Sequence, residues 1–269
     1  MAIIEGRNPV IEALKAGRPI SKILLDSNIK KQGAVELILT LSRSRGVLVE
    51  FVERQVIEKQ ASTGSSQGVI AFVEAKEFVD LDELMAISRA KSDPPLYILL
   101  DGIEDPHNLG AILRTAEAAG VHGIVIRERR AAGITPVVVR ASAGAVEYVN
   151  IARVANISQA VVTLKKSGVW VTGIDMDGQT DYRALDFTLP SAIVIGGEGT
   201  GLSELVRKRC DWVASIPMKG KIMSLNASVA AAVVMYEAIR QRDGADFSNL
   251  PQTTKMRSSS RGIAEGKRL

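Results

Sequence analysis

The sequence predicts an α/β fold in which helices cover a parallel sheet. Between residues 96 and 242, short apolar segments alternate with segments of helical spacing, and repeated β–α units of this kind imply parallel strands. The segments 96–100 and 192–195 are apolar throughout, which is typical of strands buried on both faces. A shorter series of helices and strands precedes residue 75, and 269 residues are enough for two domains. We therefore expect a small N-terminal α/β domain followed by a larger parallel-sheet domain.

The small domain is predicted over residues 1–75. Its expected elements are a helix at 8–16 stopped by Gly17, a strand at 20–26, a helix at 34–44 ending at Gly46, a strand at 47–52, a helix at 54–60 and a strand at 69–73. Residues 61–68 form a polar loop before the last strand. Residues 76–95 are predicted to be a linker with one helix at 81–90. Pro94 and Pro95 end the linker, because successive prolines exclude helix.

The larger domain is predicted over residues 96–242. Strands are expected at 96–100, 123–127, 170–174, 192–195 and 213–216, and helices at 109–119, between Asn156 and Gly168, at 203–209 and at 225–242. Residues 243–269 are rich in Ser, Lys and Arg with little apolar content, so we expect a basic, disordered tail. Ligands of parallel sheets bind at the carboxyl ends of the strands, so the loops after these strands are where chemistry is expected.

Composition narrows the classes of function. The chain has a single cysteine and two histidines, so no intrachain disulfide forms and a zinc site built from His and Cys is disfavoured. We expect no metal and a reducing, cytoplasmic location. The longest nearly apolar stretch, 227–235, is far shorter than a membrane span, and the N-terminus lacks the apolar core of a signal peptide. A net charge of +4 permits nucleic acid as a partner without demanding it.

The first loop that follows a strand runs from Asp101 to Arg114. Asn108 is expected to cap the helix that starts there, and Gly110 and Arg114, four residues apart, share one face of it. We expect an arginine one turn from a helix N-terminus to bind a phosphate or a carboxylate. The alternative is a capped helix with an ordinary surface arginine.

Two later loops share this position after a strand. The loop 196–201 carries four glycines and one acid, Glu198, and its spacing differs from that of the dinucleotide-binding fingerprint. The loop 216–228 leads into the last helix, where either Ser224 or Asn226 is placed to cap the helix. A flexible loop and a plain helix cap are the alternatives here. The residues alone therefore predict a ligand site at one sheet edge without naming a reaction.

At these loops the sequence closely resembles the SpoU (TrmH) family of RNA ribose 2′-O-methyltransferases in the SPOUT superfamily. The three family motifs occur in order: 105–110 through Arg114, then 196–201, then 216–218 with 224–226. Residues 6–10 and 67–69 further resemble the subgroup with an N-terminal ribosomal-protein-like RNA-binding domain, which includes the 23S rRNA guanosine 2′-O-methyltransferases. The resemblance spans about residues 3–242.

The resemblance implies S-adenosylmethionine as methyl donor, a deep trefoil knot in the larger domain, and a homodimer with the final helix at its interface. The cofactor-binding positions that it implies are Gly173, Gly196, Gly197, Gly201, Ile216 and Leu225. The catalytic positions that it implies are Asn108, Arg114, Glu198, Ser224 and Asn226.

A sulfonium is an activated methyl donor, so the enzyme must mainly position the ribose oxygen and assist the loss of one proton. An arginine side chain stays protonated in proteins, and we therefore expect Arg114 to clamp a phosphate and the developing oxyanion. Glu198 would orient groups or accept the proton. The expected substrate is a guanosine of 23S rRNA. A tRNA methyltransferase and a non-catalytic RNA-binding ribosome-assembly protein are the alternatives, and a nucleotide-dependent oxidoreductase is disfavoured by the missing fingerprint.

Overall fold

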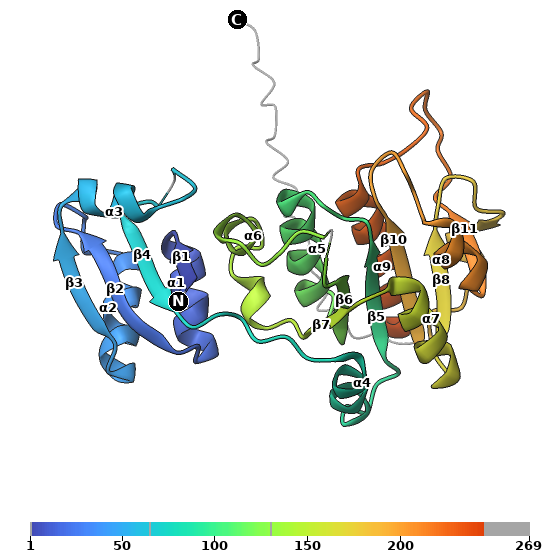
Figure 1. The fold of residues 1–269 in the computed structure, drawn as a ribbon, viewed down its shortest axis with the longest axis horizontal. Coiled ribbons are helices and arrows are strands. Elements are labelled where there is room, and N and C mark those ends of the chain that lie inside the picture. The colour runs from blue at the N-terminus through green and yellow to red at the C-terminus, as the bar shows by residue number, and fades with distance from the viewer. Residues whose placement is uncertain (1, 65, 130, 245–269) are drawn as a thin grey trace, which may run out of the picture.

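The structure, a computed structural model, describes residues 2–64, 66–129 and 131–244. Figure 1 shows two sheets side by side, joined by a linker that passes below them. Most of the predicted tail, residues 245–269, lies outside the described residues. In the part of the chain that is described, no helix is long and apolar enough to cross a membrane.

The first sheet has four strands in the order β1-β4-β2-β3, with β2 and β3 parallel and the other pairs antiparallel. The strands are β1 (Ala2–Glu5), β2 (Ile20–Asp26), β3 (Leu48–Val52) and β4 (Val69–Val73). Helices α1 (Arg7–Ala16) and α2 (Ala34–Arg45) bury their apolar residues against one face. Helix α3 (Arg54–Gln60) covers the other face through Ile57.

The second sheet has seven parallel strands in the order β7-β6-β5-β10-β8-β11-β9. The strands are β5 (Leu96–Asp101), β6 (Gly123–Arg127), β7 (Ile151–Val154), β8 (Trp170–Ile174), β9 (Thr180–Asp181), β10 (Ser191–Gly196) and β11 (Trp212–Ser215). The chain order changes direction between β5 and β10, because β6 and β7 lie on one side of β5 and all later strands on the other. Such a switch point is the usual ligand site of an open parallel sheet.

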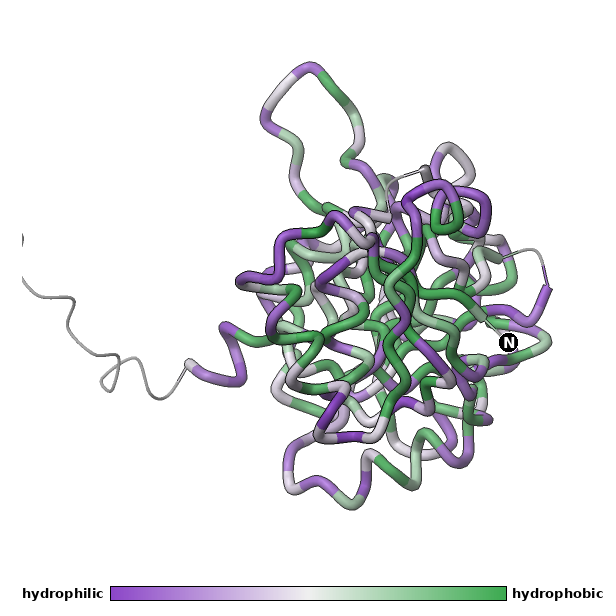
Figure 2. The backbone as a smooth tube through the Cα atoms, turned by 90° about the vertical axis from the view of Figure 1, so that its left-hand side faces the viewer, coloured by the Kyte–Doolittle hydropathy of each residue, from purple (hydrophilic) through white to green (hydrophobic). Residues whose placement is uncertain are grey.

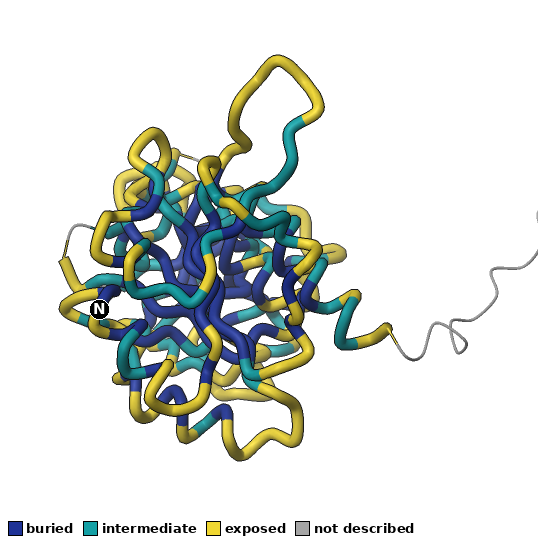
Figure 3. Tube along the Cα trace, turned by 90° about the vertical axis from the view of Figure 1, so that its right-hand side faces the viewer, coloured by how far each residue is buried: buried dark blue, intermediate teal, exposed yellow. Residues whose placement is uncertain are grey.

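Helices bury both faces of the second sheet. Ile98 and Leu100 face α5 (Pro106–Ala118), α6 (Pro136–Ala141) and α9 (Ala227–Asp243), whereas Tyr97 and Leu99 face α4 (Leu81–Arg89), α7 (Ile157–Lys166) and α8 (Glu204–Arg209). The apolar strands therefore lie at the centre of the domain, as Figure 3 shows by burial. Figure 2, seen from the side of the first domain, shows the hydrophobic segments toward the middle of the molecule. The loop 216–226 rises from the carboxyl edge of this sheet in Figure 1 and is largely exposed.

The starts of α5 and α9 are set by their capping residues. Helix α5 begins at Pro106, three residues before the predicted start, because Pro106 fits the first helical position and Asp105 Oδ1 accepts the His107 amide. The prediction that Asn108 caps this helix is wrong. At the last helix, Asn226 rather than Ser224 is the cap, with its Oδ1 accepting the Ser228 and Val229 amides.

Charged contacts hold the first domain against the second. Arg18, just after α1, pairs with Glu147 at a distance of 2.5 Å, and the two side chains are 8% and 2% exposed. Tyr148 Oη lies 2.6 Å from Glu12 Oε2 on α1. Burial, helped by the Glu12 carboxylate, raises the pKa of Tyr148 to about 12, so the phenol stays a donor. These contacts involve α1 and the short helix Ala145–Glu147, so they fix the first domain to the outer end of the second sheet.

A buried carboxylate anchors the loop before β4. Glu5 is 0% exposed, and its two oxygens accept the backbone amides and the hydroxyls of Ser62 and Thr63. Burial alone raises the pKa of Glu5, but these hydrogen bonds outweigh burial and hold the pKa below 4.5, its ordinary value. The loop is therefore tied to β1.

We expect Glu5→Gln to lower the free energy of unfolding by ~1–3 kcal/mol, because an amide cannot accept from all four donors. A carboxylate with a lowered pKa stabilises the fold above its unfolded pKa, and this contribution is lost as the pH falls through the folded value. The wild type should therefore lose more stability than the variant in urea denaturation as the pH falls from 7 to roughly pH 3, with the loss concentrated below the unfolded pKa. The exposed Glu104→Gln is the matched control, and an equal pH dependence of wild type and Glu5→Gln would contradict the assignment.

Candidate active site

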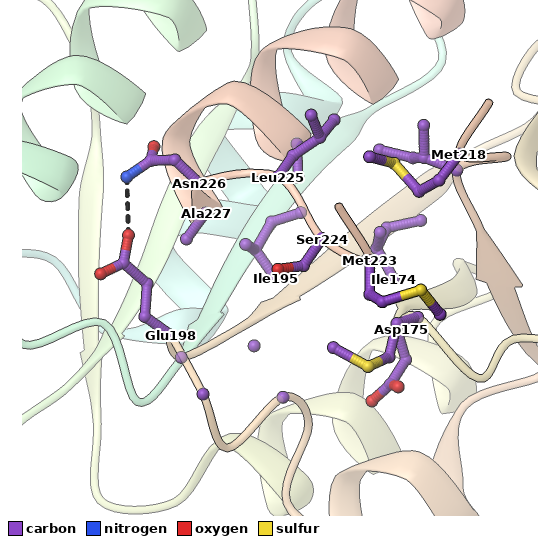
Figure 4. A pocket seen from close by; sticks show the side chains of 17 residues that line it. Ile174, Asp175, Ile195, Glu198, Met218, Met223, Ser224, Leu225, Asn226 and Ala227 are labelled. Atoms are coloured by element: carbon purple, nitrogen blue, oxygen red, sulfur yellow. Dashed lines mark hydrogen bonds between the residues drawn. The ribbon is translucent and has the colours of Figure 1, made fainter. Parts of the chain in front are cut away.

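Three loops at the carboxyl edge of the second sheet meet at one carboxylate. Asn108 Nδ2 donates to Glu198 Oε1 at 3.0 Å, and Asn226 Nδ2 donates to the same oxygen at 2.6 Å. Asn226 Nδ2 also lies 2.9 Å from Asn108 Oδ1. Figure 4 shows Asn226 and Glu198 facing each other across the mouth of the site. The three motifs that the sequence places far apart therefore form one hydrogen-bonded cluster.

Local structure fixes how these side chains point. Because Asp105 caps α5, Asn108 lies in the first turn with its amide available for Glu198, and the residue is only 5% exposed. Asn226 uses its oxygen to cap α9, and this orients its NH2 group toward Glu198. The Ser228 hydroxyl adds a further hydrogen bond to that oxygen, at 2.6 Å. The orientation of the Asn226 amide is thus set by the helix that follows it.

The glycine loop makes room for close backbone approach. A Cβ on Gly196 would lie 2.3 Å from the Gly201 backbone, and one on Gly197 would lie 2.5 Å from Gly102 O. Gly201 has a φ of +62°, a left-handed conformation that favours glycine. The amide of Gly201 donates to Gly197 O at 3.0 Å and closes the loop. The glycines therefore allow the loops after β5 and β10 to pack against each other.

A cavity of about 360 Å³ opens between the loops that follow β8, β10 and β11. Its lining combines glycine backbone with apolar side chains and polar groups, and consists of Ile174, Asp175, Met176, Ile195, Gly196, Gly197, Glu198, Gly199, Gly201, Ile216, Met218, Met223, Ser224, Leu225, Asn226, Ala227 and Ala230. Figure 4 shows the labelled members around the hollow. Among these described residues two are carboxylates and none is Lys, Arg or His, so the charge of the lining favours a cationic ligand.

Most of the predicted site residues border this cavity. Gly196, Gly197, Glu198, Gly201, Ile216, Ser224, Leu225 and Asn226 line it, and Asn108 reaches it through Glu198. Gly173 does not line the cavity. It lies within β8, where the side chains of Leu202 and Cys210 occupy the space that a Cβ would need, so the structure gives it a packing role instead.

Arg114 lies outside the cavity lining. Because α5 starts at Pro106, this arginine is more than two turns into the helix, not one turn as the sequence suggests. Its side chain is exposed, and within the described residues it forms no ion pair. Gly110, on the same face, packs against Ala141 of α6, so this glycine serves helix packing.

Asp175 is a cavity residue that sequence analysis missed. Its side chain is 8% exposed, its Oδ2 accepts the Leu202 amide at 3.2 Å, and Arg207 lies 3.4 Å from its Oδ1. It stands directly after β8, so the rule that ligands bind at carboxyl ends of strands was a usable signal. Met218 and Met223, which also line the cavity, had no such signal. Over the described stretches no group of three or more His, Cys, Asp or Glu residues is arranged to hold a metal ion.

A parallel sheet with a cavity at the carboxyl ends of its strands, closed by glycine backbone and an Asn–Glu–Asn cluster, defines an α/β enzyme that binds an organic cofactor. The chain belongs to the SpoU rRNA methylase family, whose model matches residues 95–236. A second model, RNA 2′-O ribose methyltransferase substrate binding, matches residues 3–79. The protein is therefore an S-adenosylmethionine-dependent RNA ribose methyltransferase, with the substrate-binding region in its first domain.

Relatives agree in both sequence and structure. A Bacillus subtilis protein named as a TrmH family tRNA/rRNA methyltransferase is 44% identical, over 88% of this chain and 95% of its own. The SpoU methyltransferase AviRb from Streptomyces viridochromogenes, solved with AdoMet, is 30% identical with a TM-score of 0.75, and the match covers 89% of each chain.

Two further structures differ in how much of this chain they cover. An AdoMet-bound rRNA methyltransferase from Sinorhizobium meliloti is 28% identical with a TM-score of 0.70, over 89% of this chain and 87% of its own. A TrmH/SpoU tRNA modifying enzyme from A. aeolicus is 29% identical with a TM-score of 0.53, and it covers 65% of this chain and 90% of its own.

The cluster geometry separates two roles for Glu198. Both amide donors bind Oε1, so the structure favours Glu198 as a group that positions Asn108 and Asn226. We expect Glu198→Gln, which keeps an acceptor oxygen, to retain single-turnover methyl transfer within ~10-fold, and Glu198→Ala to lose ~10² or more. AdoMet affinity measured by calorimetry controls for cofactor loss. Equal losses in both variants, at unchanged AdoMet affinity, would favour Glu198 as the proton acceptor instead.

Proposed function

We propose that this enzyme methylates the ribose 2′-hydroxyl of a guanosine in 23S rRNA. The supporting observation is the extent of the structural matches. The neighbour named as an rRNA methyltransferase shares both domains with this chain, whereas the neighbour named as a tRNA modifying enzyme covers little more than the second. The first domain, which matches the substrate-binding family model, is thus shared with the neighbour named for rRNA and largely absent from the match to the neighbour named for tRNA.

The residues present fit S-adenosylmethionine, which supplies a methyl group activated by its sulfonium charge. The apolar walls, such as Ile195 and Leu225, suit an adenosine, and the carboxylates of Asp175 and Glu198 suit a ligand of net positive charge. Gly196, Gly197, Gly201 and Ile216 would contribute backbone groups. Asn108, Ser224 and Asn226 would position the ribose at the mouth of the cavity, where the cluster lies.

Arg114 remains the proposed clamp for an RNA phosphate. Its exposure on α5, outside the cavity, suits contact with a polyanion that lies over the site rather than with the cofactor. We also propose the trefoil knot that the family resemblance implies. The loops after β10 and β11 border one cavity, which supports the proposal. The single cysteine, Cys210, accords with a cytoplasmic location.

The test of the function is methyl transfer in vitro from AdoMet to deproteinised 23S rRNA and, separately, to total tRNA, with the modified nucleotide mapped by ribose-methylation profiling. We expect one guanosine of 23S rRNA to be modified without added metal. Methylation confined to tRNA would overturn the substrate assignment. AdoMet binding with no transfer to either RNA would support the non-catalytic alternative.

Arg114→Ala should lower methyl transfer by ~10² or more, because one preorganised donor to a developing charge is worth about that much. AdoMet affinity should stay within a few-fold, since Arg114 does not line the cavity. Arg114→Lys keeps a charge but loses the planar fork, so it should rescue little and show no steep rise in rate between about pH 8 and 10. Single-turnover rates at saturating RNA distinguish a phosphate clamp from a base. If the rate of the lysine variant rose strongly at alkaline pH, residue 114 would act as a base.

We propose that two copies of the chain associate through α9. Val229 and Tyr236, seven residues apart on one face of this helix, are 47% and 53% exposed, although the opposite face is buried in the core. An apolar stripe beside the cavity is typical of an obligate interface.

The double variant Val229→Lys/Tyr236→Lys should be monomeric in light scattering, because four buried charges per dimer would face one another. Leu205→Lys, equally exposed on α8, is the control and should leave the mass unchanged. A dimer that persists in the double variant, or a monomeric wild type, would exclude this interface.

A further inference from the structure

The first domain contains a second cavity, about 370 Å³ in volume, on a different part of the molecule from the cofactor cavity. Its lining is mostly polar and comprises Arg7, Asp26, Asn28, Ile29, Lys30, Gln32, Arg54, Gln67 and Gly68. It joins the two N-terminal motifs, at Arg7 and at Gln67–Gly68, that the sequence places sixty residues apart. The methyltransfer site uses none of these residues.

The walls of this cavity are held in place by the surrounding structure. Gln67 has a φ of +55°, unusual for a residue with a side chain, and its Oε1 accepts the Arg7 amide at 3.2 Å. Glu5 anchors the neighbouring loop through Ser62 and Thr63. Gly68 keeps the floor open, because a Cβ there would lie 3.1 Å from Asp26 Cβ. The cavity is therefore preformed.

The charges in the lining of this cavity favour a ligand that carries an anionic group next to a polar group. Arg7, Lys30 and Arg54 come from three separate segments, against one acid, Asp26, in the lining. Arg54 also pairs with Glu58, which is not a lining residue, through an exposed contact of 2.7 Å. Arg7 lines the cavity, and its buried Nε has no hydrogen-bond partner among the described residues. Asp26 is 8% exposed and accepts the Asn28 amide through Oδ1, which leaves Oδ2 beside Gly68 at the floor.

We propose that this cavity receives one unpaired nucleotide of the RNA substrate, with its phosphate on the three cations and its base edge at Asp26 and Gln67. The inference rests on the proposed function, in that the ligand is RNA. A carboxylate accepts from the exocyclic amino group of a base, and Ile29 and the arginine planes provide surfaces for a base to stack on. A base inside a duplex cannot enter a cavity, so the nucleotide must be unpaired.

The position of the cavity suits this role. It lies where β2 ends and α3 begins, and in Figure 1 this end of the first domain points the same way as the 216–226 loop of the second. One RNA could therefore contact both cavities from the same side of the molecule. The contact would recognise a feature of the substrate away from the methylated ribose.

The experiment measures binding of a fluorescein-labelled RNA of about 20 nucleotides, single-stranded or annealed to its complement, to the full chain by anisotropy over a range of salt. Lys30→Gln/Arg54→Gln removes two exposed cations from the cavity. The control, Arg43→Gln/Lys166→Gln, removes the same charge from the far end of α2 and from α7.

We expect the cavity variant to bind single strands ~10-fold or more weakly near 150 mM salt, with a salt slope smaller by about 0.7, because the one phosphate held in the cavity contributes about that much. The control should stay within two-fold of wild type, and AdoMet affinity should not change in either. Wild-type affinity in the cavity variant, or an equal loss for duplex and single strand, would overturn the proposal.

Asp26→Asn tests the base contact separately from the phosphate contact. If Asp26 accepts from a base, the variant binds single strands more weakly or changes its base preference, although it is less negative. If only phosphate binds here, the loss of a negative charge tightens binding to every RNA, and the nucleotide assignment fails. In either event methylation by the wild type still reports on the proposed function, so the failure of the cavity and the failure of the function are distinguishable.

Discussion

The active site depends on one helix cap. Asn226 Oδ1 accepts hydrogen bonds from the first amides of α9, and this orients its NH2 group to donate to Glu198. Asn108 completes the cluster only because Asp105, rather than Asn108, caps α5. Two ordinary capping interactions thus set the geometry of three loops. Loss of either cap would therefore alter the hydrogen bonds at Glu198 before it affected the sheet.

The sheet order explains why these loops meet at all. β5 and β10 are neighbours at the switch point, and their carboxyl ends bring Gly102 and Gly197 into a contact that a Cβ on Gly197 would prevent. The glycine loop is therefore constrained by packing as well as by ligand access. The same constraint accounts for Gly110 against α6 and Gly173 beneath Leu202, positions where a small residue serves helix or strand packing.

Local patterns predicted much of the fold and part of the site. The apolar runs at β5 and β10, and the glycine stops after α1 and α2, act within a few residues, so their elements were identified nearly to the residue. β7 and α6 were not predicted, since their short segments carry weak periodicity and are stabilised by distant partners. Arg114 was placed one turn into its helix because Pro106 was not recognised as the helical start. Asp175 was missed although it directly follows a predicted strand, and only its contact with the Leu202 amide depends on the fold.

The ion pair between the two domains constrains their relative orientation, and none of the sequence motifs includes its residues. Removing the Arg18–Glu147 pair from water costs much of what its attraction gains, so the pair contributes little net stability. Its effect lies in orientation, because sliding either domain would leave a buried charge unpaired. The Tyr148–Glu12 hydrogen bond acts in the same direction at the next residue. The first domain is therefore presented to RNA at a defined angle, and a substrate must match the spacing of both domains to reach the methyl donor.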